Sequence, residues 1–420
     1  MAPAFEKDRQ YYKFCAYGFF KNLRFFEPFL LLFFLEKGLN FLEIGTLYAI
    51  QEITINIFEI PTGVLADSLG RRRSMISAFA FYILSFIIFF FSSSYWMFVV
   101  AILFYAYGDA FRTGTHKAMI FEYLKIKGWK DQKVHYYGHT RSWSQMGSAV
   151  SAMMAALIVF HSGSYRTVFL FSVFPYIIDL VLMTTYPKML DGQRKLLHKG
   201  DLLRNFSSTI RDFIYSFRNT GILKAILTQA VYTGYYKAVK DYIQPVLKTF
   251  ALSIPLFLYL ETKQRAALMV GLVYSVIYLL TSYFSRNSGR FAGRFTNLSR
   301  PLNVTMLIGL LMGLVSGFLF HYTFYLVAVI FYTGIYLIEN LRKPIGISVV
   351  AERLEKDVLA TALSAESQAE TLFAALIAPV LGFTADRLGV GVALMVVSAG
   401  LILLMPLYSA SVKGYRQREA

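Results

Sequence analysis

The stretch from Gly63 to Arg73 reads Gly-Val-Leu-Ala-Asp-Ser-Leu-Gly-Arg-Arg-Arg, and it lies between two long apolar segments. We expect Gly63 to let two helices approach closely and Gly70 to support a tight reversal of the chain. The carboxylate of Asp67 is expected to pair with the arginines that follow it, or with a helix N-terminus from the other half of the chain. The stretch therefore predicts a short, basic turn between two neighbouring helices.

Long apolar segments extend on both sides of this turn. A helix that crosses a membrane needs roughly 20 mostly apolar residues. The chain has 420 residues, of which 56% are hydrophobic and 16% are charged, with a single cysteine. This composition excludes a disordered chain and a disulfide scaffold, and it indicates an all-α membrane protein. Twelve spans are expected, at residues 11–35, 41–66, 74–93, 95–121, 138–161, 165–186, 219–250, 266–286, 301–321, 323–350, 359–384 and 389–411.

Most of the positive charge follows the even-numbered spans. Lysine and arginine outnumber aspartate and glutamate by 42 to 25, which gives a formal net charge of +17. Basic residues in short loops mark the cytoplasmic side of a membrane protein. We therefore expect a multi-pass protein of the inner or plasma membrane with both termini in the cytoplasm. The excess of positive charge therefore reflects the orientation of the helices in the membrane, and no nucleic-acid partner is expected.

The chain is predicted to consist of two related halves. An N-terminal six-helix bundle is expected at residues 1–189, a cytoplasmic linker that could hold an amphipathic helix at 190–218, and a C-terminal six-helix bundle at 219–420. Three pairs of short motifs recur in the same order, namely Gly18–Pro28 with Gly234–Pro245, Asp109–Arg112 with Glu339–Arg342, and Ser144-Gln145 with Ser367-Gln368. Two parallel repeats of six helices are a known transporter plan, with the substrate site near the membrane midplane between them.

The turn quoted above resembles the signature loop of the major facilitator superfamily, in which two glycines, an aspartate and a basic pair recur at fixed spacing. Here these positions are Gly63, Asp67, Gly70, Arg71 and Arg72. The resemblance implies twelve transmembrane helices in two pseudo-symmetric six-helix bundles, transport by alternating access, and no enzymatic activity. It also implies that the first, fourth, seventh and tenth helices line a central cavity.

Three features depart from the patterns of this superfamily. A near-match of the motif, Gly382–Gly389, falls on the expected outer side, and the equivalent of the signature loop in the second half, Ser288–Arg294, has lost the acid. Many proton-coupled exporters carry a Gly-Pro-Gly-Gly pattern in the fifth span, whereas Gly147–Val159 contains one glycine and no proline. The missing pattern weakens an assignment as a drug exporter.

Charged residues inside spans 1, 4, 7 and 10 are the candidates for substrate binding. A charge at the bilayer midplane costs roughly 2.5–3.5 kcal/mol, so each must face a hydrated cavity, a partner or a substrate. Two alternatives stay open. The charges neutralise one another with the help of Glu52 and Glu59, or cations remain for an anionic ligand such as a phosphate or carboxylate. The candidate substrate-binding residues are Lys21, Arg24, Asp109, Arg112, Tyr236, Lys237, Lys240, Tyr336, Glu339 and Arg342.

An ion gradient, most simply of protons, is the expected energy source. The chain has no phosphate-binding Gly-x4-Gly-Lys-Ser/Thr loop, so ATP is not expected to drive it. No cofactor and no metal site are expected, because the histidines lack metal-ligand spacing. The candidate proton carriers are Glu27, Asp109, Glu339, Glu366 and Glu370.

The favoured function is a secondary active transporter that moves a small organic anion or zwitterion across the lipid bilayer by alternating access with proton coupling. We expect it to act as a monomer. One alternative is a proton-driven exporter of amphiphilic or cationic compounds of the multidrug type. Another is a non-transporting receptor or lipid-handling protein with the same fold.

Overall fold

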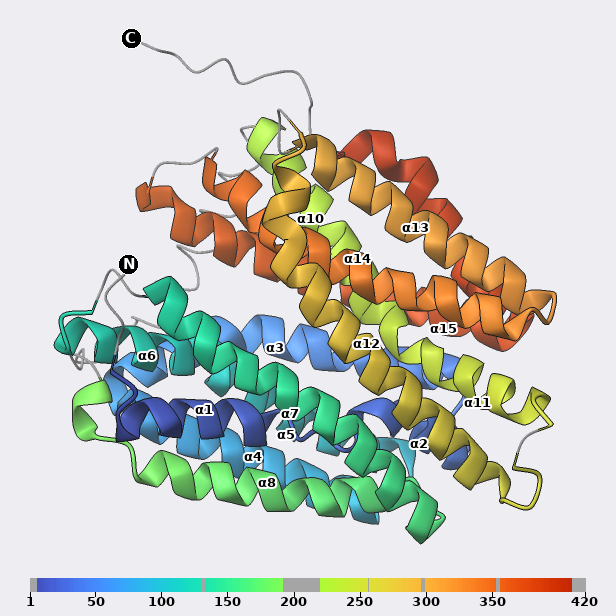
Figure 1. Ribbon diagram of the computed structural model, residues 1–420, viewed down its shortest axis with the longest axis horizontal. Helices are drawn as coiled ribbons and strands as arrows, with labels where there is room; N and C mark the ends of the chain where they lie inside the picture. Colours follow the sequence, from blue (N-terminus) through green and yellow to red (C-terminus); the bar gives the residue numbers. More distant parts are fainter. Residues whose placement is uncertain are drawn as a thin grey trace. The chain divides into compact units, whose positions relative to one another are not determined.

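A computed structural model of the protein describes residues 6–129, 133–191, 220–255, 257–295, 299–352 and 356–409. Every regular element in these ranges is a helix (Figure 1). The first half contains α1 (Arg9–Lys21), the 3-10 helix η1 (Glu27–Phe29), α2 (Leu30–Glu36), α3 (Phe41–Leu69), α4 (Arg71–Phe91), α5 (Tyr95–Arg112), α6 (Thr115–Ile126), α7 (Lys133–Ser162), α8 (Thr167–Thr184) and η3 (Lys188–Asp191). The second half contains α10 (Thr220–Val239), η4 (Lys240–Tyr242), α11 (Ile243–Ser253), α12 (Thr262–Ala292), α13 (Ser299–His321), α14 (Tyr325–Glu352) and α15 (Lys356–Tyr408).

These helices confirm the predicted membrane spans within the described residues. Most spans correspond to one helix, whereas spans 1, 4 and 7 are each interrupted, between α1 and α2, between α5 and α6, and between α10 and α11. The last two spans form the single element α15, which is kinked at Gly389, where φ is 83°. Glycine adopts this left-handed region without strain, so Gly389 permits the change of direction between spans 11 and 12.

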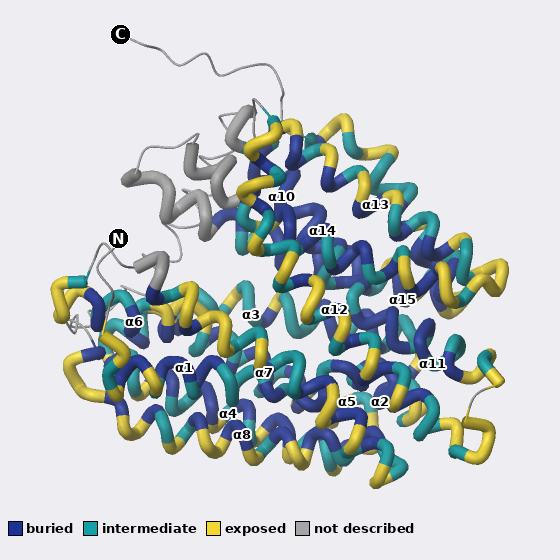
Figure 2. The backbone as a smooth tube through the Cα atoms, viewed as in Figure 1, coloured by how far each residue is buried: buried dark blue, intermediate teal, exposed yellow. Residues whose placement is uncertain are grey.

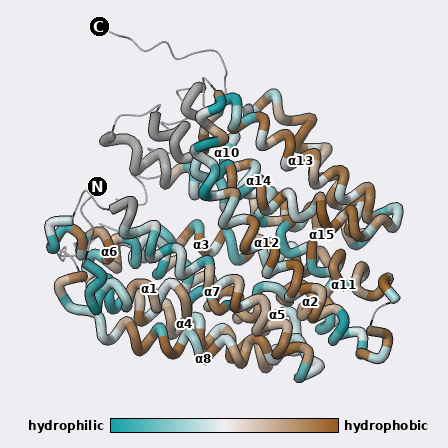
Figure 3. The backbone as a smooth tube through the Cα atoms, in the orientation of Figure 1, coloured by the Kyte–Doolittle hydropathy of each residue, from teal (hydrophilic) through white to brown (hydrophobic). Residues whose placement is uncertain are grey.

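The spans are of two kinds. Six described helices are long and apolar enough to cross a membrane by length and hydropathy alone, namely α4, α7, α8, α12, α13 and α15. Figure 3 shows the hydrophobic stretches along α8 and α13. Spans 1, 2, 4, 7 and 10 are outside this set, because charged residues or helix breaks interrupt their apolar sequence. Apolar supporting helices are thus distinct from helices that carry polar groups.

The chain divides into two compact units. The first is Met1–Leu39, Ile50–Phe206 and Ala251–Tyr278, and the second is Asn40–Ala49, Ser207–Phe250 and Leu279–Ala420. Each unit therefore contains a short segment from the opposite half of the sequence. The boundaries predicted at 1–189 and 219–420 stay a prediction. Most of the predicted linker at 190–218, with its amphipathic helix, lies outside the described residues.

Aromatic side chains fill the interior of the first unit. Within it, α1 packs against α7 and α8, and α4 packs against α5 and α8. The ring of Phe26 stacks on Phe169 at 5.7 Å, and Phe86 meets Tyr176 edge-on at 4.9 Å. Buried and exposed residues alternate along α8, as Figure 2 shows, so one face of this helix points into the unit. Such aromatic pairs add about 0.5–1.5 kcal/mol each beyond the area they bury.

Glycines bring the helices of the second unit close together. There α10 packs against α15, and α13 packs against α14 and α15. A Cβ atom added at Gly309, Gly313 or Gly317 would collide with the Tyr232 hydroxyl, the Tyr235 hydroxyl and a backbone carbonyl respectively. These three glycines, spaced four residues apart, therefore allow α13 to pack closely against its neighbours.

The signature turn is held by an aspartate that lies far away in the sequence. Gly70 has a φ of 100°, and Asp191 accepts a hydrogen bond from the backbone N–H of Arg72 at 2.8 Å. Asp67 lies 3.7 Å from the guanidinium of Arg71, as expected. The expected close packing at Gly63 is wrong here, because a Cβ atom added there would meet no atom within 4 Å.

The near-match of the motif caps a helix in the second unit. Asp386 accepts hydrogen bonds from the backbone N–H groups of Phe41 and Leu42, both at 2.8 Å. These groups form the first turn of α3, where a negative charge is stabilised by the helix dipole. Gly382 leaves room for the backbone of Phe41. This second aspartate therefore holds the beginning of span 2 against span 11.

Asp8 ties the N-terminus of α1 to α6. Its carboxylate accepts a hydrogen bond from the backbone N–H of Tyr11 at 2.9 Å and another from the Tyr123 hydroxyl, and it lies 3.6 Å from Lys127 Nζ. Partial burial raises the pKa of this carboxyl. The hydrogen bonds and the Lys127 charge outweigh burial, so the pKa of Asp8 lies below its ordinary value.

We expect Asp8→Ala to lower the free energy of unfolding by about 1 kcal/mol at neutral pH, the usual cost of a lost N-cap. Because the folded pKa is depressed, the contribution of the carboxylate is present above the unfolded pKa and is lost as the pH falls through the folded pKa. Thermal unfolding in detergent at several pH values should show the difference from wild type shrinking in acid. The Asp8→Asn variant keeps a side-chain oxygen that can accept the N-cap hydrogen bond but removes the negative charge. It therefore separates the contribution of the cap from that of the charge. A difference that grows in acid would contradict this assignment.

Candidate functional site

Span 1 is broken at the predicted basic residues. Helix α1 ends at Lys21, residues 22–26 are not helical, and the chain resumes with η1 at Glu27. The Tyr176 hydroxyl of α8 donates to the backbone carbonyl of Lys21 at 3.1 Å, which satisfies an acceptor at the end of the helix. Irregular backbone at membrane depth is tolerated only where protein or a water-filled cavity surrounds it. The break therefore marks a specialised place in the first unit.

Span 7 has the same kind of break at the matching residues. Helix α10 ends at Val239, and η4 follows at Lys240. The Tyr332 and Tyr336 hydroxyls of α14 donate to the backbone carbonyls of Val239 and Lys240, both at 2.5 Å. The rings of Tyr236 and Tyr336 meet edge-to-face at 5.3 Å. Lys237 and Lys240 are half-buried here, and both have partners within the protein.

Asp109, Arg112 and Tyr82 form a closed triad in the first unit. Tyr82 donates to Asp109 Oδ1 at 2.5 Å, and Arg112 Nη2 donates to the same oxygen at 2.7 Å. Arg112 Nε also donates to the Tyr82 oxygen at 2.9 Å. These charge-assisted bonds hold Asp109 as an anion. Asp109 and Arg112 therefore neutralise each other. For this pair, the structure agrees with the first alternative from the sequence, in which buried charges pair with one another.

Lys21 and Arg24 are less completely neutralised. Arg24 lies 3.9 Å from Glu27, and its Nε atom is buried without a hydrogen-bond partner in the described part of the chain. Lys21 forms no ion pair or side-chain hydrogen bond with any described residue. It interacts electrostatically with Arg112, Arg24, Asp109 and Glu27, and the buried acid Asp179 of α8 lies within its electrostatic range as well. Two of these neighbours are cations, so positive charge accumulates beside the break in span 1.

The matching pair in span 10 behaves differently. Arg342 is fully buried, donates to the Thr228 carbonyl at 2.9 Å and lies 4.5 Å from the centre of the Tyr232 ring. Glu339 accepts a hydrogen bond from Thr233 Oγ1 at 3.0 Å. These two side chains therefore share the sequence position of the Asp109–Arg112 pair without forming the same ion pair.

Three glutamates cluster in the second unit. Glu339, Glu366 and Glu370 are 3%, 5% and 8% exposed and interact electrostatically with one another and with Arg342 and Lys343. Glu366 Oε2 is buried without a hydrogen-bond partner among the described residues. Because three carboxyls share two cations, all three cannot be ionised cheaply. The cluster can therefore hold a proton.

Sequence reasoning missed three polar residues that lie beside the predicted site residues. Tyr82 and Thr233 were not distinguished from other polar residues of apolar helices, because their role depends on contacts with a neighbouring helix. Asp179 was missed although it is the only acid between Thr167 and Thr184. It is fully buried, and neither carboxylate oxygen has a hydrogen-bond partner among the described residues. A lone acid in a long apolar run is the signal that could have found it.

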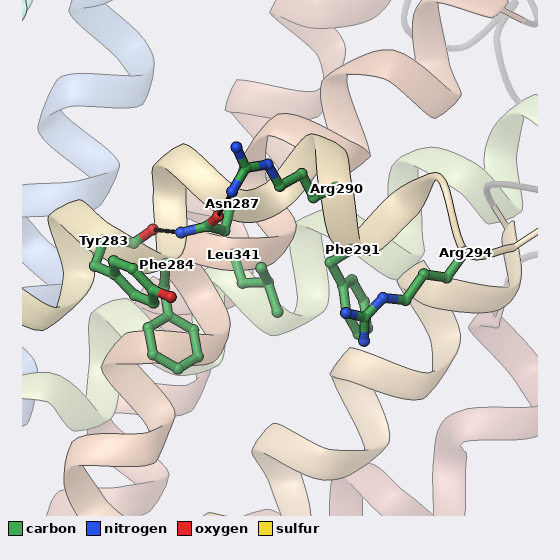
Figure 4. A pocket seen from close by; sticks show the side chains of 7 residues that line it. All are labelled: Tyr283, Phe284, Asn287, Arg290, Phe291, Arg294 and Leu341. Carbon is green, nitrogen blue, oxygen red and sulfur yellow. Dashed lines mark hydrogen bonds between the residues drawn. The ribbon is translucent and has the colours of Figure 1, made fainter.

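A separate cavity of about 340 Å³ lies beside the C-terminal part of α12. Figure 4 shows it lined by Tyr283, Phe284, Asn287, Arg290, Phe291, Arg294 and Leu341. Asn287 donates to the Tyr283 carbonyl at 2.9 Å and lies 3.4 Å from Arg290 Nη1. The lining contains none of the predicted site residues. Among the described residues, no group of three or more His, Cys, Asp or Glu side chains could hold a metal ion.

Comparison with known proteins identifies the family. The sequence pattern of the Major Facilitator Superfamily matches residues 14–367. An uncharacterized MFS-type transporter of Bacillus subtilis (strain 168), YxaM, is 29% identical over 161 residues, and the match covers 38% of this chain and only 36% of that relative.

Solved structures show the same fold. The crystal structure of a mutant form of the nucleoside transporter NupG has a TM-score of 0.76 at 15% identity, with 95% of this chain and 98% of that chain covered. A POT family transporter in complex with 5-aminolevulinic acid has a TM-score of 0.70 at 13% identity, with 96% and 97% covered. The chain therefore belongs to the Major Facilitator Superfamily, a family of multi-pass membrane transporters rather than enzymes.

Proposed function

We propose that the protein is a secondary active transporter of a small organic anion or zwitterion, coupled to protons. The observation that carries the proposal is the positive charge beside the break in span 1. Arg112 is neutralised by Asp109, whereas Lys21 has no ion pair among the described residues and Arg24 has one partner at 3.9 Å. A carboxylate or phosphate group of a substrate would supply the missing negative charge.

The proton-coupling role fits the glutamates of the second unit better than Asp109. Asp109 accepts one hydrogen bond from the Tyr82 hydroxyl at 2.5 Å and one from the Arg112 guanidinium at 2.7 Å, and both bonds stabilise its ionised form. Glu366 has a buried oxygen without a partner in the described residues, and Glu370 and Glu339 compete with it for the same cations. A proton on this cluster would relieve that competition, so we assign the coupling role to it.

The location and assembly are part of the same proposal. By the positive-inside rule, the basic residues that follow the even-numbered spans support cytoplasmic termini for a protein that we propose lies in the plasma or inner membrane. The protein is expected to act as a monomer. An exporter of cationic compounds is the second candidate, because the glutamate cluster could bind a cation. Competition of transport by organic anions or by organic cations separates the two candidates.

Neutralising the side chain of Lys21 or Arg24 should weaken the binding of an anionic substrate. We expect Lys21→Gln and Arg24→Gln each to reduce the uptake of a transported anion at least tenfold, since a hydrogen bond to a charged group contributes about 1.5–3 kcal/mol. The measurement is uptake into proteoliposomes across a panel of radiolabelled monocarboxylates, phosphate esters and amino acids. Lys263→Gln is the matched control, because Lys263 pairs with Glu36 away from the break. Unchanged uptake in both site variants would exclude the anion site.

Glu366→Gln should separate substrate movement from the proton gradient. A glutamine cannot release a proton, so we expect uphill accumulation driven by a pH gradient to be lost while exchange of substrate at equal pH persists. Both are measured in proteoliposomes with an imposed pH gradient. Glu261→Gln, at an exposed glutamate between α11 and α12, serves as the control. Retention of gradient-driven accumulation in Glu366→Gln, Glu370→Gln and Glu339→Gln alike would refute coupling through this cluster.

A further inference from the structure

Asp179 is a buried acid that no step described so far uses. It lies on α8 with 0% exposure, and both of its carboxylate oxygens have no hydrogen-bond partner among the described residues. An ionised carboxylate buried in this way is strongly penalised, and such a group escapes the penalty by taking up a proton. Asp179 is therefore held in a place that suits a neutral carboxyl.

Lys21 is the cation that faces this acid. It is the charged side chain with which Asp179 interacts electrostatically, although the two are not close enough to form an ion pair. Asp179 follows Tyr176 by three residues, so both lie on the same face of α8. Tyr176 donates to the Lys21 carbonyl at 3.1 Å, which fixes this face of α8 beside the break in span 1. Two opposite charges thus lie near each other, and each lacks a partner among the described residues.

The arrangement recurs at the other helix break. On α14, Tyr336 donates to the Lys240 carbonyl, and Glu339 follows it by three residues. In both units a tyrosine binds the backbone of a lysine at the end of a broken helix, and an acid lies one helical turn further on. Glu339 belongs to the glutamate cluster of the second unit. The local arrangement is thus the same at both breaks, although Asp179 lies in span 6 and the sequence counterpart of Glu339 is Asp109 in span 4.

We propose that Asp179 is a proton-binding site whose proton affinity depends on whether the Lys21 ammonium group is free or holds a substrate anion. This inference rests on the proposed anion site at Lys21. When a substrate anion binds the Lys21 ammonium group, the Asp179 carboxylate takes one proton from water and becomes neutral. When the anion leaves, the carboxyl O–H bond breaks, the proton returns to water, and the positive charge of the freed Lys21 stabilises the carboxylate electrostatically. One proton then moves at this site with one negative charge of the substrate, in the same direction and in addition to the proton that we assign to the glutamate cluster of the second unit.

The other titratable groups near Asp179 are neutral aromatic side chains. From α1, Tyr17 lies within electrostatic range, and from α8 and the residues after it so do Tyr176 and Tyr186. On α4, the Tyr82 ring contacts Tyr176 at 5.2 Å, and its hydroxyl is occupied by the Asp109 triad. Arg24 and Arg112 are charged groups that interact electrostatically with Tyr17 and Tyr176, and each has an acid of its own, Glu27 and Asp109.

His116 of α6 stacks on the Tyr17 ring at 3.5 Å and lies 3.2 Å from the Tyr186 hydroxyl. Both of these tyrosines interact electrostatically with Asp179. Lys21 is therefore the charged group that sets the proton affinity of Asp179 directly, and its removal is the most selective test.

The test detects the proton itself in the purified full-length protein. Infrared difference spectra between pH steps should show the C=O stretch of a protonated carboxyl that Asp179→Asn removes. Lys21→Gln should move the titration midpoint of that band to higher pH by about one to three units, because it removes a nearby positive charge. Asp8→Asn is the matched control, since it removes a partly exposed carboxyl and should leave the band unchanged. Asp179→Glu should restore a titrating band if Asp179→Asn folds poorly.

Two results would overturn the proposal. Either no carboxyl band depends on Asp179 between mildly acidic and mildly alkaline pH, or the band titrates identically in wild type and Lys21→Gln. These spectra need no substrate, so they remain decisive even where the anion uptake test fails. The link to an anion is tested by adding sodium acetate or sodium phosphate to the same samples. A midpoint that rises with either probe supports the exchange, and a band that depends on Lys21 but ignores every transported anion contradicts it.

Discussion

Inside a bilayer, backbone polar groups and charges have no bulk water to bind, so the protein must satisfy each of them itself. Most of the described helices meet this requirement with their own backbone bonds. Spans 1 and 7 do not, because each stops part-way at a lysine-containing segment. In both places tyrosine hydroxyls from another helix bind the freed carbonyls of Lys21, Val239 and Lys240. The positions of α8 and α14 against the broken helices follow from this need, and so does the placement of the acids they carry.

The two units solve the problem of buried charge differently, although their sequences repeat. In the first unit, Asp109 and Arg112 close on each other through Tyr82. In the second, Arg342 binds backbone carbonyls and the face of Tyr232, which leaves Glu339 to Thr233 and to its neighbouring glutamates. One unit thus keeps an excess of positive charge near Lys21, whereas the other gathers carboxyls. A duplicated scaffold has therefore acquired two different electrostatic environments.

Much of the fold could be predicted from the sequence, because apolar runs of span length and basic loops are strong local signals. The helix break after Lys21 could not be predicted this way, since the Tyr176 hydroxyl that stabilises it comes from a helix 155 residues away in the sequence. The site residues were predicted by type and depth, and the pair Asp109–Arg112 was found. The different fate of Glu339 and Arg342 depends on Tyr232 and Thr233 of a neighbouring helix, which spacing along one helix does not show. Asp179 could have been found from the sequence as the lone acid of a long apolar run, but its lack of hydrogen-bond partners among the described residues could not.

Lys21 connects these observations, because it has more than one candidate partner and cannot satisfy them together. An ammonium group that turns to a substrate anion withdraws positive charge from Asp179, and a carboxyl that loses this charge binds a proton more tightly. By linkage, protonation of Asp179 must strengthen anion binding by the same factor. The coupling needs no direct contact between proton and substrate, only a shared lysine. A permanent ion pair between Lys21 and Asp179 would abolish this coupling. In the structure the two groups interact electrostatically, but the Asp179 oxygens have no hydrogen-bond partner among the described residues. The incomplete pairing at this break is therefore what makes coupling available, at the cost of an unsatisfied buried acid.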